Sequence, residues 1–149
     1  MATAKTRITL TNHADLDLGR RGFLPAKCVR KAEVDALVDT GASPLVLPPL
    51  LAVQLGLRPE GRRKIRYADG RSLDLLWVSG VRLELLGRAM SCDALVEPFA
   101  RLPRVGQLVL ATLDLTVDLL RATVEVNPAS PDLPLVDLLP ASWASAALA

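Results

Sequence analysis

Hydrophobic and polar positions alternate in short stretches along the chain, and turn-forming residues recur roughly every eight to twelve positions. The segment 6–12, TRITLTN, alternates and predicts a strand. The segment 31–40, KAEVDALVDT, changes from alternating to continuously apolar, which is typical of a strand that enters a core. Between them, the segment 14–31 is polar and contains Gly and Pro, so we expect a connection between the two strands there.

Two apolar segments predict short helices. Residues 48–57, PPLLAVQLGL, follow a short apolar strand at 44–49, and the two prolines suit the first turn of a helix. Gly56 suits the point at which that helix stops. Residues 104–113, RVGQLVLATL, begin with an apolar-Gly step and continue as a second short helix.

Three further segments predict pairs of strands. They lie at 63–78 around Ala68-Asp69-Gly70, at 80–98 around Gly87, and at 113–127. Asp-Gly between two apolar runs is a good hairpin signal. The fold class that we expect is therefore all-β: a small closed barrel with one or two short helices. We expect a single domain at 1–127 and a tail at 128–149 that is rich first in Pro and then in Ala and Ser.

The composition restricts the kinds of partner. Half of the 149 residues are hydrophobic and only five are aromatic, so the core must be mostly Leu, Val and Ala. A net charge of +2 is too small to imply a nucleic-acid partner, and aromatic side chains for base stacking are nearly lacking. Six basic residues do fall within fourteen positions, a run that usually forms a solvated face: Arg58, Arg62, Arg63, Lys64, Arg66 and Arg71.

Membrane and metal partners are not expected either. Residues 1–12 lack the apolar region of a secretory signal, and no window reaches the ~18 uninterrupted apolar residues of a membrane span. Cys28 and Cys92 lie far apart, and together with the single His13 they cannot make a plausible zinc site. We expect no cofactor, no metal, and two buried free thiols in a cytoplasmic protein.

One aspartate stands out from this apolar pattern. Asp39 follows the strand end 36–38 and precedes Gly41, which permits a tight turn, and a second apolar run at 45–47. An Asx turn would explain Asp-Thr-Gly without any catalysis. The flanking apolar runs instead favour a buried backbone that leaves one carboxylate at the floor of a cleft.

The sequence around Asp39 resembles the retropepsin-like (retroviral-type) aspartic proteases. Three elements carry the resemblance in order: LVDTGAS at 37–43 followed by LGL at 55–57, RYADG at 66–70, and RVGQLVLATLDLTVD at 104–118. The similarity covers roughly Ile8 to Pro134 and is greatest to small bacterial and cyanobacterial members, whose chains end in a similar Pro-rich tail. In this family the second element is a flap hairpin, and the third is an apolar-Gly signature that leads into a helix.

The resemblance implies peptide-bond hydrolysis with Asp39 as the catalytic residue. Two carboxylates that share one proton activate a water molecule in such enzymes. This chain has one Asp-Thr-Gly, so the second carboxylate must come from a second copy in a symmetric homodimer. Thr40 would bond across the dimer axis, Gly41 would approach the substrate backbone, and Ala42 matches the retroviral pattern. The flap would comprise Tyr67, Ala68, Asp69 and Gly70, and the second signature would centre on Val105 and Gly106.

Two functions compete on these residues. The first is a homodimeric aspartic endopeptidase with a polypeptide substrate. The second is a catalytically silent homodimer that holds extended peptides in the same cleft, since a clamped strand needs no activated water. A buried Asp39 favours the enzyme because a carboxylate is costly to keep in a pure binding site. Tyr67 also has a plainer interpretation as an ordinary strand aromatic, and Arg104 stands where many relatives carry an apolar residue.

Overall fold

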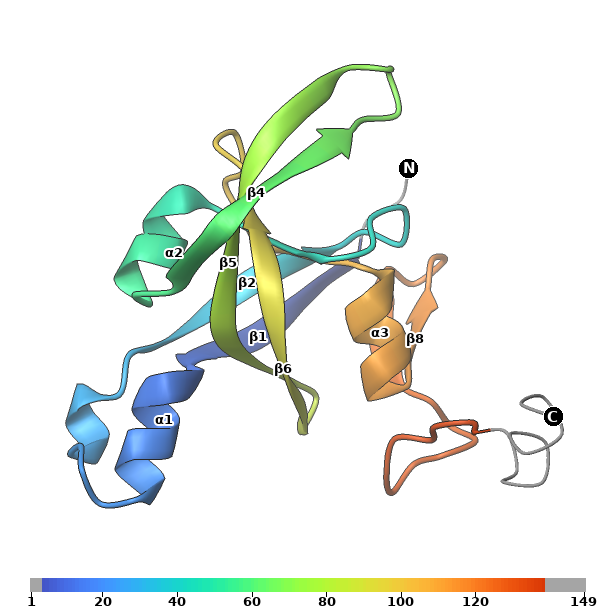
Figure 1. Ribbon diagram of the computed structural model, residues 1–149. Coiled ribbons are helices and arrows are strands. Elements are labelled where there is room, and N and C mark those ends of the chain that lie inside the picture. Colours follow the sequence, from blue (N-terminus) through green and yellow to red (C-terminus); the bar gives the residue numbers. More distant parts are fainter. Residues whose placement is uncertain (1–3, 139–149) are drawn as a thin grey trace, which may run out of the picture.

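The computed structural model describes residues 4–138, and seven of its strands form one curved sheet (Figure 1). Its strands are β1 (Ala4–Asn12), β2 (Lys31–Val38), β3 (Leu45–Leu47), β4 (Arg58–Arg66), β5 (Ser72–Leu85), β6 (Arg88–Val96) and β7 (Arg104–Val105). Their order is β1-β2-β7-β3-β6-β5-β4, and β1 also pairs with β5. That extra pairing closes six strands into a barrel and leaves β4 outside it, which confirms the all-β barrel.

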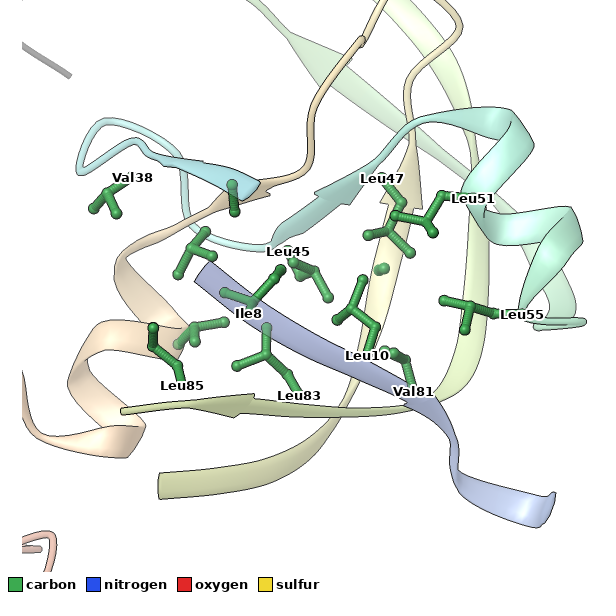
Figure 2. Packing of buried hydrophobic residues seen from close by; sticks show 14 of the residues in the cluster. Ile8, Leu10, Val38, Leu45, Leu47, Leu51, Leu55, Val81, Leu83 and Leu85 are labelled. Carbon is green, nitrogen blue, oxygen red and sulfur yellow. The ribbon is translucent and has the colours of Figure 1, made fainter. Parts of the chain in front are cut away.

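Leucine and valine side chains fill the barrel, as the scarcity of aromatic residues predicted. Ile8 and Leu10 of β1 point into the core beside Leu83 of the adjacent strand β5, and all three are at most 1 % exposed (Figure 2). Leu45 and Leu47 of β3 enter from the other side, so every wall of the barrel contributes side chains. Burial of this apolar surface is the main stabilising force of the fold.

Residues 4–138 contain three α-helices, one more than the upper limit that the sequence predicted. The helices α2 (Pro49–Gln54) and α3 (Gln107–Leu113) lie where the pattern placed them, and Gly56 ends the first with φ +63°. The helix α1 (His13–Arg20) and the 3₁₀ turn η1 (Ala26–Cys28) occupy the segment that was predicted to be a connection only.

The helix α1 escaped prediction because its buried face is polar. Asn12 caps it by accepting a hydrogen bond from the backbone N–H of Asp15 at 2.9 Å. Asp15 is buried and binds Arg30, with 2.7 Å between the carboxylate and Nε. The guanidinium holds the pKa of Asp15 below its usual value. A charge pair across 15 residues thus replaces the apolar stripe by which a helix is normally recognised.

The strand β5 is longer than the sequence pattern indicated. Residues 72–85 form one strand, whereas the pattern predicted a break between 78 and 80. Gly80, at φ +86°, lies in a β-bulge where the register with β6 shifts between Val78 and Val81. The glycine therefore bends a continuous strand toward β1 and helps to close the barrel.

The remaining strands follow α3 in the sequence. The strands β8 (Leu115–Asp118) and β9 (Thr123–Val126) form the hairpin expected at 113–127. Residues 139–149 of the expected tail lie outside the described residues, and its boundary at 128 stays a prediction. No helix among residues 4–138 is long and apolar enough to cross a membrane. Both cysteines are free, but Cys28 is exposed and Cys92 only partly buried, so the expectation of two buried thiols was wrong.

Candidate active site

The loop Asp39–Ala42, called the Asp39 loop below, begins where β2 leaves the barrel. The strand β7 runs parallel to the end of β2 and fixes it there. The backbone N–H of Leu37 donates to the carbonyl of Pro103 at 2.9 Å, and that of Asp39 donates to the carbonyl of Val105 at 3.0 Å. These bonds extend the hydrogen-bonded pairing of β2 and β7 as far as Asp39. The barrel, and not the loop alone, therefore fixes the position of Asp39.

The Asp39 loop is a tight turn with a half-buried carboxylate. Oδ1 of Asp39 accepts a hydrogen bond from the N–H of Gly41 at 3.0 Å, and the N–H of Ala42 donates to the carbonyl of Asp39 at 3.2 Å. The Asx-turn geometry is therefore present. It occupies one oxygen of the carboxylate only, and Asp39 still lines the cleft described below.

The helix α3 supports the Asp39 loop from behind. Gln107 donates its backbone N–H to the carbonyl of Ala42 at 2.7 Å, and Leu108 donates to that of Ser43 at 3.0 Å. Gly106 precedes the helix, and a Cβ at this position would meet the carbonyl oxygens of Ala42, Ser43 and Pro44 within 2.7 Å. Only glycine permits this close approach. The residue that the sequence singled out in the second signature thus lies directly beneath the loop.

The segment Tyr67–Gly70 forms the tip of the β4–β5 hairpin, which extends away from the barrel in Figure 1. The N–H of Tyr67 donates to the carbonyl of Arg71 at 2.8 Å, and that of Gly70 donates to the carbonyl of Tyr67 at 2.9 Å. Gly70 has φ +89°, a conformation that L side chains rarely adopt. The carboxylate of Asp69 accepts bonds from the backbone N–H and the side chain of Arg71, which lower its pKa. The hairpin predicted from Asp-Gly is present.

A cleft of about 480 Å³ separates the Asp39 loop from this hairpin. Asp39, Gly41 and Ala42 line one side, and Tyr67 and Ala68 line the other. The other predicted site residues do not line this cleft; they are Thr40, Asp69, Gly70, Val105 and Gly106. Thr40 is exposed at the outer side of the loop, whereas Val105 and Gly106 hold the loop from below.

An apolar wall completes the cleft. Val46, Leu75 and Leu95 are each 4 % exposed and form a small cluster of their own, apart from the barrel core. Ile65 of β4 packs against this cluster, and all four residues line the cleft beside Asp39. A site of this kind accepts an apolar side chain next to a polar group.

Two residues that the sequence analysis did not assign to the site also line the cleft. Glu97 is 7 % exposed, and its Oε2 accepts hydrogen bonds from the Tyr67 hydroxyl and from Nη2 of Arg104, both at 2.7 Å. Burial, and then the bond to Glu97, raise the pKa of Tyr67. Tyr67 is therefore more than a strand aromatic. No local motif marks Glu97; the one signal in the sequence was Arg104, a cation within an apolar segment, which needs an acid partner wherever it is buried.

The two carboxylates that line the cleft, Asp39 and Glu97, differ in the number of hydrogen bonds that they accept. Glu97 is held by two donors, whereas Asp39 has a single bond from its own loop. Proton sharing between two carboxylates needs a second acid close to Asp39, and in the described part of one chain Glu97 is the only other carboxylate in the lining. Nor do residues 4–138 contain a group of three His, Cys, Asp or Glu side chains that could hold a metal ion.

Comparison with known families agrees with this geometry. A family model described as aspartyl protease matches residues 26–117, which is more than half of the chain. The matched range includes the Asp39 loop, the β4–β5 hairpin and the apolar-Gly step at Val105 and Gly106. A search among curated proteins gave no match.

Proposed function

This chain belongs to the aspartyl protease family, and we propose that it is an endopeptidase in which Asp39 residues from two identical chains activate one water molecule. The family match confirms the resemblance to retropepsin-like proteases that the motifs predicted. The observation that carries the proposal is the position of Asp39. A barrel strand and a helix hold its half-buried carboxylate at a cleft, opposite a hairpin tip.

The proposed chemistry uses two carboxylates in different protonation states. One accepts a proton from the water, which attacks the carbonyl carbon of the scissile bond. The other is protonated and donates a hydrogen bond to the carbonyl oxygen, which becomes the oxyanion of a tetrahedral intermediate. Two carboxylates this close cannot both be ionised, so a single shared proton is the ground state. The carboxylate that accepted the proton from the water then donates it to the nitrogen of the leaving amine as the C–N bond breaks.

A homodimer supplies the second carboxylate, because the sequence has one Asp-Thr-Gly. A two-fold axis beside the Asp39 loop would bring the two Asp39 side chains together. Thr40 is exposed beside Asp39 and is free to bond across that axis. Gly41 would approach the substrate backbone, and the flap, Tyr67 to Gly70, would cover the bound peptide. The proposed partners are a polypeptide and a second copy of this chain, in the cytoplasm.

A silent peptide-binding dimer is the second candidate, and one observation favours it. The strand β4 lies at the edge of the sheet, where its outer backbone groups are available to an added strand. A peptide could bind there through main-chain hydrogen bonds without being cleaved. The two candidates share the cleft and differ in the need for Asp39.

The substitution Asp39→Asn separates these candidates. It keeps the side-chain shape and the bond from Gly41 but removes the shared proton, so peptide hydrolysis should fall by more than about 10²-fold. The matched control is Asp35→Asn, at an exposed aspartate of β2 that pairs with Arg7. Cleavage of a fluorogenic peptide library measures activity, and sedimentation at micromolar concentration measures assembly.

Each outcome has a distinct meaning. Loss of hydrolysis in Asp39→Asn but not in Asp35→Asn supports the endopeptidase. Hydrolysis that survives in Asp39→Asn places the catalytic group elsewhere. A wild-type protein that binds peptides, and cleaves none of them across the acidic and neutral pH range, is the silent module. A strictly monomeric protein that hydrolyses peptides excludes the shared site.

A further inference from the structure

We propose that this cleft selects acidic polypeptide segments, with Lys64 and Arg66 of β4 binding carboxylates that flank the scissile bond. The inference rests on the proposed endopeptidase for the cleavage itself, but the binding preference can be measured without it. Its basis is the charge balance of the β4–β5 hairpin and of the cleft that this hairpin covers.

The strand β4 carries more positive charge than its surroundings neutralise. Residues 58–74 contain six basic and three acidic side chains. Glu60 pairs with Arg58, and Asp69 pairs with Arg71 at 2.7 Å. Within residues 4–138, four basic side chains of this strand are left without an ion pair: Arg62, Arg63, Lys64 and Arg66.

These four side chains are placed differently. Arg63 lies over the ring of Trp77, with 5.1 Å between the guanidinium carbon and the ring centroid. Arg62 donates to the backbone carbonyl of Asp74 at 3.4 Å. Lys64 and Arg66 are exposed and also line the cleft with Asp39. Lys64 lies opposite Asp74 in the sheet register but forms no ion pair with it.

The cleft itself does not neutralise Lys64 and Arg66. Glu97 is already matched by Arg104, at 2.7 Å, and by the Tyr67 hydroxyl. In the proposed dimer the two Asp39 carboxylates hold one proton and together carry one negative charge. Lys64 and Arg66 from both chains then bring four positive charges to the same cleft. A substrate with carboxylates beside the scissile bond would supply the missing negative charge.

The apolar wall explains why the bound segment is a polypeptide. Val46, Leu75 and Leu95 offer an apolar surface in the same cleft as Asp39, Lys64 and Arg66, and β4 lies at an edge of the sheet. A nucleic acid would need stacking aromatics instead. On this hairpin Tyr67 is bonded to Glu97 and Trp77 is covered by Arg63. An extended segment with an apolar residue and acidic neighbours fits the apolar wall, the basic side chains and the sheet edge of β4.

Two fluorogenic decapeptide libraries test the preference. Both carry Leu, Val or Phe at the central positions, and the flanking positions hold Glu and Asp in one library and Gln and Ser in the other. We expect kcat/KM to be about tenfold higher for the acidic library at low ionic strength, mainly through KM. The advantage should shrink to about twofold near 0.5 M salt, where the screening length is only a few ångströms.

Substitution of the two proposed residues should remove the preference. In Lys64→Gln/Arg66→Gln the tenfold advantage of the acidic library should fall to about twofold or less. The urea concentration at which the same variant unfolds should match that of the wild type, which shows that the variant is folded. The matched control is Arg20→Gln/Lys27→Gln, which removes one Arg and one Lys near α1, at the far end from the hairpin in Figure 1. This control should keep the preference.

A charge-reversed variant gives a second, independent readout. Lys64→Glu/Arg66→Glu should prefer peptides with Lys and Arg at the flanking positions over the acidic library. Equal cleavage of the two original libraries by the wild type would overturn the inference and leave the endopeptidase standing. A preference that persists in Lys64→Gln/Arg66→Gln would also overturn the inference, because other residues would then carry it.

Binding measured by fluorescence anisotropy separates the two proposals. If the wild type cleaves neither library but binds the acidic decapeptides more tightly through Lys64 and Arg66, the endopeptidase fails and the inference stands. Equal binding of acidic and neutral decapeptides overturns it. Tighter binding of a single-stranded oligonucleotide of the same charge, lost in Lys64→Gln/Arg66→Gln, also overturns it and assigns β4 to nucleic acid.

Discussion

Two acidic side chains with little solvent exposure each lie close to an arginine, and they differ in what surrounds them. Glu97 joins three elements around the cleft: its own strand end at β6, Tyr67 at the hairpin tip and Arg104 of β7. Asp114 follows α3 and, apart from Arg88 of β6, contacts only C-terminal residues. It accepts hydrogen bonds from Asn127, from Ser130 and from the backbone N–H of Leu135.

The arginines differ in the same way. Arg88 is 7 % exposed and donates to the carbonyls of Leu113, Asp114 and Ser130, so each of its bonds serves the C-terminal segment. Arg104 is partly exposed and lines the cleft together with its partner Glu97. The comparison teaches that an acid paired with an arginine does not by itself indicate function. Glu97 and Arg104 line the cleft and can position a substrate, whereas Arg88 and Asp114 do not line it and serve only to hold the C-terminal segment.

The largest expected effect is on stability. Arg88→Met leaves three carbonyls and Asp114 without their buried cation, so the free energy of unfolding should fall by about 3 kcal/mol. Urea denaturation followed by circular dichroism measures it. The control Arg82→Met, at a half-buried arginine of β5, should change it by about 0.5 kcal/mol or less. Arg88→Met as stable as the wild type would mean that the Asp114 network anchors nothing.

A smaller effect is expected at the cleft, and on turnover rather than on stability. Tyr67→Phe removes the hydroxyl that Glu97 binds, so the hairpin tip should lose its fixed position over the substrate. We expect kcat/KM to fall about tenfold, the worth of one hydrogen bond to a charged group. The free energy of unfolding should change by less than about 1.5 kcal/mol.

Glu97→Gln sharpens the same test. It keeps an acceptor for Tyr67 but leaves Arg104 without its anion. Tyr67→Phe/Glu97→Gln should lose less activity than the two single losses combined, because both substitutions break one network. Strictly additive losses in kcat/KM would show that Tyr67 and Glu97 act separately, and the contrast with Asp114 would weaken.

The last expected effect is the pH dependence that Asp114 contributes to stability. Hydrogen bonds from Ser130, then Asn127 and the N–H of Leu135, lower the pKa of Asp114 from 3.8 to about 2. A carboxyl with a lowered folded-state pKa stabilises the fold above the unfolded value and loses that contribution as the pH falls through the folded one. The wild type should therefore exceed Asp114→Asn in stability near neutral pH, and the gap should narrow between about pH 4 and pH 2. A gap that is constant over this range would contradict the assignment.

Local sequence determined much of this protein. Apolar alternation gave β1, β2 and the β8–β9 hairpin, because residues on one face of a strand must all be apolar to be buried. Asp69-Gly70 and Gly56 marked a turn and a helix end, since both positions need a positive φ. Asp39 was found from the residues beside it, because a tight turn after a strand is a local requirement, and Gly106 was found from the resemblance of residues 104–118 to the second signature of the family. These signals act over a few residues, and a single sequence contains them.

Tertiary structure alone decided the rest. The helix α1 depends on Asp15 meeting Arg30, and the polar side of the cleft depends on Glu97 meeting Tyr67 and Arg104 across 30 and 7 residues. Closure of the barrel depends on β1 reaching β5. Each of these contacts stabilises a charge or a strand edge through a partner that lies far along the chain or on another element. Their energy appears only when the folded chain brings both partners together and removes water from them, so no local pattern contains it.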